Sequence, residues 1–228
     1  MGAKDSTEKI LEEYNDVFAD IINVLMFGGK QVVHEDELED AQPHSMYKAD
    51  GKIHENERDV SKYWKKYGIV ISLLGCENQT EYDPDMTLRL FSYDGASYRA
   101  QLNNGSRQHY PVFTLVLYFG EKRWKAKHTL SEAVDFPQGL ENELRPFFND
   151  YRMNLFEISY LTEEQVKMFR SDFRVVAEYF VKSRKDPDYV PDDIVIRHVD
   201  EVLKLLSTMT GDRRFEEVLY RPKSKEAK

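Results

Sequence analysis

The sequence predicts an α/β fold followed by a C-terminal helical region. Three features indicate this class: an apolar segment over Ile69–Gln79, a second one over Val112–Phe119 that is rich in β-branched and aromatic residues, and helical periodicity in the last third of the chain. With 228 residues, of which 41% are hydrophobic, the chain can bury a core and is too apolar to be disordered.

The chain is expected to begin with an amphipathic helix. Residues 5–27 carry an apolar stripe at helical spacing, which Asp5 or Ser6 can cap and Gly28–Gly29 ends. Residues 34–57 are polar and without a clear period, so we expect a surface loop there.

The middle of the chain predicts strands with a helix between them. Residues 58–64 and 69–79 flank a turn-like Lys-Lys-Tyr-Gly segment and predict a β-hairpin. Residues 86–102 repeat apolar side chains at steps of three and four, which predicts a helix. Residues 112–119 are apolar on both faces, as in a central strand, and residues 151–158 are a further candidate strand.

The last third is expected to be helical. Thr162 and Gln165 fit a capping box at the start of a long helix. Asp192 or Asp193 can cap a second helix that ends at Gly211.

We therefore divide the chain into three parts: a core over residues 1–160, a helical region over 161–220 that packs on the core, and a basic tail over 221–228.

Charge is unevenly distributed along the chain. The 32 Lys and Arg against 41 Asp and Glu give a net charge of −9, which argues weakly against nucleic-acid binding. Acidic residues gather between Glu35 and Asp40. Basic residues gather at Arg58, Lys62, Lys65 and Lys66, then at Lys122, Arg123, Lys125 and Lys127, and in the tail from Arg213. Each cluster alone is typical of a solvated face.

The expected setting is the cytoplasm. No apolar run reaches the ~20 residues that cross a bilayer, the N-terminus lacks the apolar core of a secretion signal, and we expect no membrane association. The single cysteine, Cys76, rules out an internal disulfide.

One pair of acids stands out on the predicted hairpin. Asp59 lies nine residues before Gly68 and Glu77 nine after it, so a turn near Gly68 would set them opposite each other on adjacent strands. Gln79, two residues beyond Glu77, shares its face. Two facing carboxylates repel unless a cation lies between them, and Mg²⁺ or Mn²⁺ suits such oxygen ligands. The alternative is that Asp59 pairs with Arg58 or a lysine, and that Glu77 marks the end of a buried strand.

Several segments resemble a known family. In chain order these segments are VFADIINVLMFGGKQVV, RDVSKYW, GIVISLLGCENQTEYDPDMTLRLFSYDGASY, VFTLVLYFGEKRW and TMTGDRRFEEVL. They are similar to the recombination-promoting nuclease (Rpn) or putative transposase family, YhgA-like, of the PD-(D/E)XK nuclease superfamily. GxENQ followed by MxLRxxxYD is the specific part. The resemblance implies a restriction-endonuclease-like mixed sheet core flanked by helices.

The resemblance also implies roles for individual residues. Asp59 matches the first acid of the superfamily pattern and Glu77 the second, which implies that both hold the metal, while Gln79 stands where the superfamily has a lysine. An acid from the first helix sometimes joins such sites; Asp16 and Asp20 are candidates, with Asp20 preferred, and the alternative is that each is a solvated residue of that helix. Arg89 would contact a DNA phosphate, or else form an ion pair with Asp85, Asp94 or Glu81.

Two functions follow as hypotheses. The first is a Mg²⁺- or Mn²⁺-dependent DNA endonuclease with Asp59, Glu77 and Gln79 as its catalytic residues. The second is a weak or inactive nuclease fold that binds DNA or a protein, because glutamine brings no positive charge in place of lysine. RNA as the substrate and a homodimer as the assembly are left open.

Overall fold

The computed structural model describes residues 11–41, 44–49, 52–57, 59–105, 108–125, 127–190, 195–212 and 214–215. They belong to two compact units. The sheet unit is Glu37–Glu157, and the helical unit combines Met1–Asp36 with Ile158–Lys228. Within the described part of the chain, no helix has the length and apolar character needed to cross a membrane.

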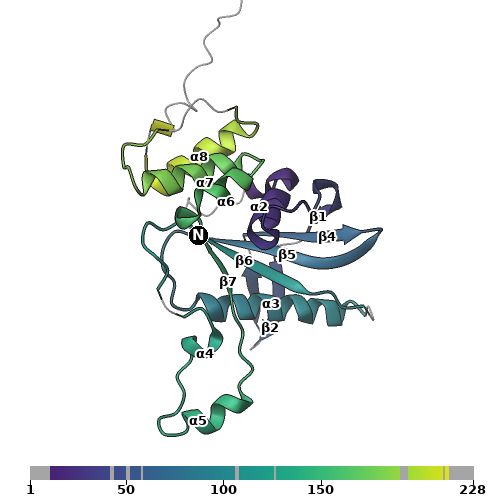
Figure 1. Cartoon of the computed structure of the whole chain (residues 1–228). Helices are drawn as coiled ribbons and strands as arrows, with labels where there is room; N and C mark the ends of the chain where they lie inside the picture. The colour runs from purple at the N-terminus through teal and green to yellow at the C-terminus, as the bar shows by residue number, and fades with distance from the viewer. Residues whose placement is uncertain are drawn as a thin grey trace, which may run out of the picture. The chain divides into compact units, whose positions relative to one another are not determined.

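The strands of the described residues all belong to the sheet unit, and Figure 1 shows the sheet together with α3. Its strands are β1 (Leu38–Asp40), β2 (His44–Ala49), β3 (Lys52–Glu57), β4 (Val60–Lys66), β5 (Ile69–Gln79), β6 (Val112–Tyr118) and β7 (Asn154–Glu157). Its helices are α3 (Met86–Asn103), α4 (Leu130–Ala133), α5 (Glu141–Leu144) and the 3-10 turn η2 (Arg145–Phe147).

Five strands form a mixed sheet in the order β1-β4-β5-β6-β7. The β1–β4 and β4–β5 pairs are antiparallel, whereas β5–β6 and β6–β7 are parallel. The connection from β5 to β6 runs through α3, as a parallel pair requires. A separate hairpin pairs β2 with β3. The mixed sheet and its helix confirm the predicted α/β class.

The hairpin of β4 and β5 has a two-residue turn and a bulge. Tyr67 and Gly68 both have positive φ, at 53° and 77°, and join Lys66 to Ile69 in a tight turn. A bulge between Trp64 and Lys65 then shifts the pairing by one residue. The bulge decides which residues of β4 face which residues of β5 beyond it.

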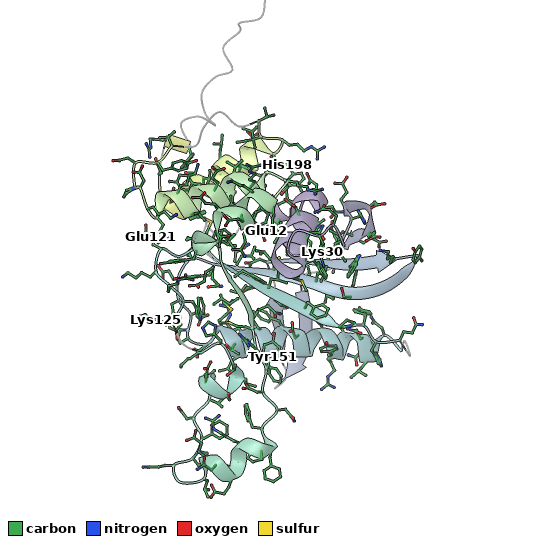
Figure 2. The ribbon with its side chains drawn as sticks, in the orientation of Figure 1. Glu12, Lys30, Glu121, Lys125, Tyr151 and His198 are labelled. Atoms are coloured by element: carbon green, nitrogen blue, oxygen red, sulfur yellow. The ribbon has the colours of Figure 1, made fainter. Side chains whose placement is uncertain are left out.

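Helix α3 packs on one face of the sheet. Met86 and Leu90 of α3 are buried in one apolar cluster with Val116 and Tyr118 of β6. Farther along α3, the buried Asp94 accepts hydrogen bonds from Thr114 of β6 and from Tyr151, both at 2.7 Å; Figure 2 shows Tyr151 beside this helix. These contacts fix the face of α3 that the sheet meets.

The helical unit is built from elements at both ends of the chain. They are α2 (Asn15–Phe27), η1 (Glu35–Glu37, whose last residue begins the sheet unit), η3 (Ile158–Tyr160), α6 (Glu163–Met168), α7 (Phe173–Ser183) and α8 (Val199–Thr210). Helix α2 ends as predicted at Gly28, with φ at 60°, and α8 ends as predicted at Gly211, with φ at 71°. Thr162 and Gln165 form the predicted capping box of α6.

The predicted loop over residues 34–57 is wrong, because it contains η1 and the strands β1, β2 and β3. Strand β1 is only three residues long, and its sequence is mostly acidic. It forms because its backbone pairs with the edge of β4: Glu39 lies opposite Tyr63, and Asp40 lies opposite Lys62. Such pairing is invisible in a local sequence window.

The predicted helices differ from the observed ones at their ends. Helix α2 begins at Asn15, because Tyr14 is extended and binds elsewhere: its hydroxyl donates to Glu201 at 2.9 Å, and its ring stacks on His198 at 3.8 Å. The proposed caps at Asp5 and Ser6 lie outside the described residues.

The long helix predicted after Thr162 is divided in two. Helix α6 ends at Met168 and α7 begins at Phe173, because the Asp20 carboxylate accepts hydrogen bonds from the backbone N–H groups of Arg170 and Ser171, both at 2.7 Å. Helix α8 begins at Val199, later than predicted, and the proposed caps at Asp192 and Asp193 lie outside the described residues.

The strand ends differ by only a few residues. The strand predicted at 58–64 is β4 over Val60–Lys66, and the candidate strand at 151–158 is β7 over Asn154–Glu157. The predictions for 69–79, 86–102 and 112–119 agree with β5, α3 and β6 to within one residue.

Candidate functional site

The β4–β5 hairpin brings Asp59 beside Glu77. The last pair of the ladder is Val60 with Cys76, so the next position in the same register sets Asp59 opposite Glu77. The Asp59 carboxylate also accepts a hydrogen bond from the backbone N–H of Asn78 at 2.7 Å. Without the bulge, the two-residue turn would set Asp59 opposite Cys76 instead.

Glu77 and Gln79 lie on the face of the sheet that α3 covers. In the parallel β5–β6 ladder, Glu77 is aligned with Val116 and Gln79 with Tyr118, and both β6 residues pack against α3. Cys76, the neighbour of Glu77 in β5, points to the other face of the sheet and is fully buried as a small core residue.

Arg89 of α3 joins this group through its guanidinium. Its Nη2 donates to Oε1 of Glu77 at 2.9 Å, and its Nη1 donates to Oδ2 of Asp83 at 2.8 Å. The Tyr93 hydroxyl accepts from Nε and Nη2, both at 3.2 Å. Glu77 is 2% exposed, so the guanidinium neutralises a carboxylate that water hardly reaches.

These surroundings keep Arg89 charged and Tyr93 neutral. Burial disfavours the charged guanidinium, but the hydrogen bonds to Asp83 and Tyr93 and the charge of Glu77 outweigh it, so the pKa of Arg89 is raised. Burial and the nearby Glu77 carboxylate also raise the pKa of Tyr93. The guanidinium is therefore a permanent cation beside the two acids.

The sequence predicted an ion pair for Arg89 as an alternative to phosphate contact, but with other partners. Asp83 lies in the loop before α3, six residues from Arg89, and no helical spacing indicates the contact. Asp94, one of the proposed partners, instead faces Thr114 and Tyr151. The sequence did not indicate two features of the site: the ion pair of Arg89 with Asp83, and the hydrogen bonds from Arg89 to the Tyr93 hydroxyl.

The donor set fits a hard divalent cation in its chemistry. Asp59 and Glu77 offer carboxylate oxygens, and the half-buried side-chain amide of Gln79 makes no hydrogen bond to another described residue. The backbone carbonyl of Gln79, by contrast, accepts from the N–H of Phe119 at 2.8 Å. Among the described residues, no three His, Cys, Asp or Glu side chains gather as a ready metal cluster. A cation would thus have two carboxylates and share Glu77 with Arg89.

The helix acids have other contacts. Asp20 is 6% exposed, and it holds the connection between α6 and α7 through its Oδ2. Asp16 pairs with Arg197 at 2.9 Å and with His198 at 3.3 Å. Both belong to the helical unit, and the part of Asp20 in the Asp59–Glu77 site stays a prediction.

Two of the charge clusters neutralise each other. Strand β4 presents Lys62, Lys65 and Lys66 to the acidic segment around β1, and these lysines form ion pairs with Asp40, Glu39 and Glu37 in that order. Lys62 is fully buried rather than solvated, which corrects the expectation of an ordinary solvated face at that position.

The basic loop after β6 starts beside the site. Phe119, whose N–H binds the carbonyl of Gln79, leads into a loop in which Lys122 and Lys125 are exposed. Lys125 lies 5.8 Å from the centre of the Tyr82 ring, and Arg123 pairs with Glu157 at 2.5 Å.

The fold and the site define a class: an α/β protein with opposed carboxylates at the end of a sheet hairpin and an arginine from the following helix. The chain belongs to the family described as putative transposase, YhgA-like, whose model matches residues 66–210, more than half of the chain. This confirms the family that the sequence resembles. The matched range includes Glu77, Gln79 and Arg89 and begins after Asp59. No curated protein and no solved structure matches the chain.

Proposed function

We propose that this chain is a Mg²⁺- or Mn²⁺-dependent DNA endonuclease of the PD-(D/E)XK type, acting in the cytoplasm. The observation that carries the proposal is the register that sets Asp59 opposite Glu77, with Gln79 on the face of Glu77. Membership of the transposase-like family supports DNA as the partner. RNA and a homodimer stay predictions.

In this proposal Asp59 and Glu77 hold the cation, and the Gln79 amide positions the attacking water by hydrogen bonds. The cation would supply a more acidic water and would stabilise charge on the phosphoryl oxygen. Arg89 belongs to the same group through Glu77, so it can bind a phosphate oxygen once its contact with Glu77 is relaxed. The exposed Lys122 and Lys125 lie on the loop that starts beside Gln79 and add positive charge for a DNA strand.

The test is cleavage of duplex DNA by the full chain with Mg²⁺ or Mn²⁺. Asp59→Asn and Glu77→Gln should each reduce cleavage by 100-fold or more, on the order of the loss when an enzyme loses an electrostatic contact in its transition state. Glu39→Gln removes a carboxylate of β1 that pairs with Lys65, and it should cleave like the wild type. Equal cleavage by all four proteins would refute the roles given to Asp59 and Glu77.

Metal binding can be measured apart from cleavage. Calorimetric titration with Mn²⁺ should show one site in the wild type and none in Glu77→Gln, and Mn²⁺ should raise the Tm of the wild type alone, because a ligand of the folded state stabilises it.

A second function is favoured by one observation: Arg89 already neutralises Glu77. On this alternative the chain is a nuclease fold without catalysis that binds DNA. It predicts no metal-induced change in Tm and DNA binding in EDTA that weakens steeply with salt.

A further inference from the structure

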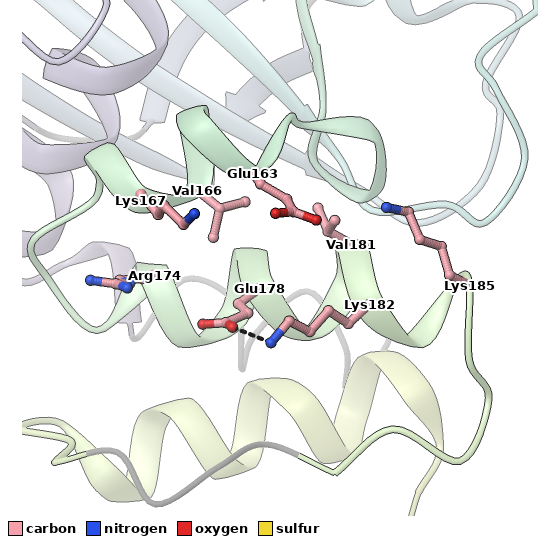
Figure 3. Close-up of a pocket in the computed structure, with 8 residues that line it drawn as sticks. All are labelled: Glu163, Val166, Lys167, Arg174, Glu178, Val181, Lys182 and Lys185. Carbon is pink, nitrogen blue, oxygen red and sulfur yellow. Dashed lines mark ion pairs between the residues drawn. The ribbon is translucent and has the colours of Figure 1, made fainter.

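The helical unit contains a groove of about 160 Å³ between α6 and α7 (Figure 3). Its lining comprises four cations, two acids and two valines: Lys167, Arg174, Lys182, Lys185, Glu163, Glu178, Val166 and Val181. The valines are 5% and 4% exposed, so they form a buried apolar floor beneath charged side chains.

The two helices that form the groove are held in place from outside it. Asp20 binds the backbone of Arg170 and Ser171 in the connection between them. Asp172, at the start of α7, accepts hydrogen bonds from the backbone N–H groups of Arg197 and His198 at 2.9 and 2.5 Å. The groove is thus preformed, and a ligand would not have to order it.

The charges in the groove do not cancel. Lys182 pairs with Glu178 at 2.5 Å, which leaves three cations against Glu163. Lys167, Arg174 and Lys185 are exposed, and their side chains make no ion pair or hydrogen bond with another described residue. This contrasts with the lysines of β4, each of which has a carboxylate partner, and it is unexpected in a chain of net charge −9.

The cations are spread along the groove. Figure 3 shows Lys167 and Arg174 toward one end and Lys185 at the other. Arg174 and Lys182 are eight residues apart on one helix, a rise of about 12 Å at ~1.5 Å per residue. One phosphate cannot contact charges so far apart, whereas a nucleic-acid strand carries a charge about every 3.4 Å along the helix axis.

We propose that this groove binds the phosphate backbone of DNA, independently of its sequence, through Arg174, Lys185 and Lys167. The inference rests on the proposed DNA function and adds a second contact surface, outside the Asp59–Glu77 site. Lysine and arginine act here as cations for phosphates, and they contribute affinity rather than sequence recognition.

The experiment measures the binding of a labelled duplex to the full chain in EDTA, where metal-dependent cleavage is absent, over a series of salt concentrations. Arg174→Gln/Lys185→Gln should lower the slope of log K against log salt by about 1.8, since each phosphate contact contributes ~0.9. The matched control is Lys30→Gln/Lys204→Gln, which removes two exposed cations of the same unit outside the groove and should keep the wild-type slope.

Three results would overturn the inference: a wild-type slope in the groove variant, an equal loss in groove and control variants, or no DNA binding by the wild type at any salt. A polyglutamate peptide that binds the wild type but not the groove variant, with DNA binding unchanged, would assign the groove to an acidic protein partner instead. Asp59→Asn separates the two proposals, because it should lose cleavage and keep the DNA slope.

Discussion

Replacing Arg89 by methionine tests the central contact of the candidate site. The change removes the charge but keeps an unbranched side chain on α3. The Glu77 side chain is 3% exposed and loses its guanidinium partner. Breaking a fully buried ion pair costs about 3–5 kcal/mol, and because the Arg89 side chain is 40% exposed we expect about 2 kcal/mol. In a chain of 228 residues, this corresponds to a Tm lower by about 4–8 °C in EDTA.

Metal should offset this loss. In the wild type a cation at Glu77 must share the carboxylate with Arg89, whereas in Arg89→Met the carboxylate is left to the metal. A metal at 100 times its Kd stabilises the folded state by about 2.7 kcal/mol, so Mn²⁺ should raise the Tm of the variant by more than that of the wild type.

Thermal melting with and without Mn²⁺ measures both effects. Arg99→Met is the matched control, since Arg99 is an exposed residue of the same helix and should melt like the wild type. A double-mutant cycle with Glu77→Gln should give a coupling energy of about 2 kcal/mol between the two charges. Zero coupling, or an equal Mn²⁺ effect on wild type and Arg89→Met, would refute the reasoning.

Two further predictions concern stability. Gly68→Ala should lower the free energy of unfolding by about 1 kcal/mol, because Gly68 has φ at 77° in the turn between β4 and β5. Gly95→Ala within α3 should raise it by about 0.5–1 kcal/mol. Urea denaturation measures both, and an equal loss in the two variants would contradict the claim that the turn needs glycine at position 68. Burial raises the pKa of Asp16, but the hydrogen bonds from Arg197 and His198 outweigh burial, so the pKa is lowered in the folded state. The charged Asp16 therefore stabilises the fold. This contribution is complete above the ordinary pKa of ~3.9 and is lost as the pH falls through the lowered pKa. Asp16→Asn should therefore be less stable than the wild type by on the order of 1 kcal/mol at pH 7, and the difference should shrink as the pH falls through the lowered pKa of Asp16. A difference that does not shrink in acid would show that the charge is not responsible.

The sequence by itself determined the elements whose signals are local. The apolar run of β5, the helical spacing of α3 and the capping box at Thr162 each lie within a few residues of one another, so the chain needs no distant partner to reveal them. The two acids could be predicted to face each other because a hairpin relates them by symmetry about its turn. That prediction assumed that the pairing of the two strands is symmetric about Gly68. The observed two-residue turn alone would not give this register, and the bulge at Trp64 shifts the pairing by the one residue that is needed.

Only the tertiary structure decided the contacts between distant residues. Strand β1 depends on the edge of β4, and the break between α6 and α7 depends on Asp20, about 150 residues away in sequence. The ion pairs of Arg89 are with Asp83 and Glu77 instead of the predicted Asp94 of its own helix. In each case a charged or polar group is satisfied by a partner that packing supplies. Local propensity does not encode that partner, since the contact forms only when the fold brings both groups together, and its strength depends on how far the fold shields it from water.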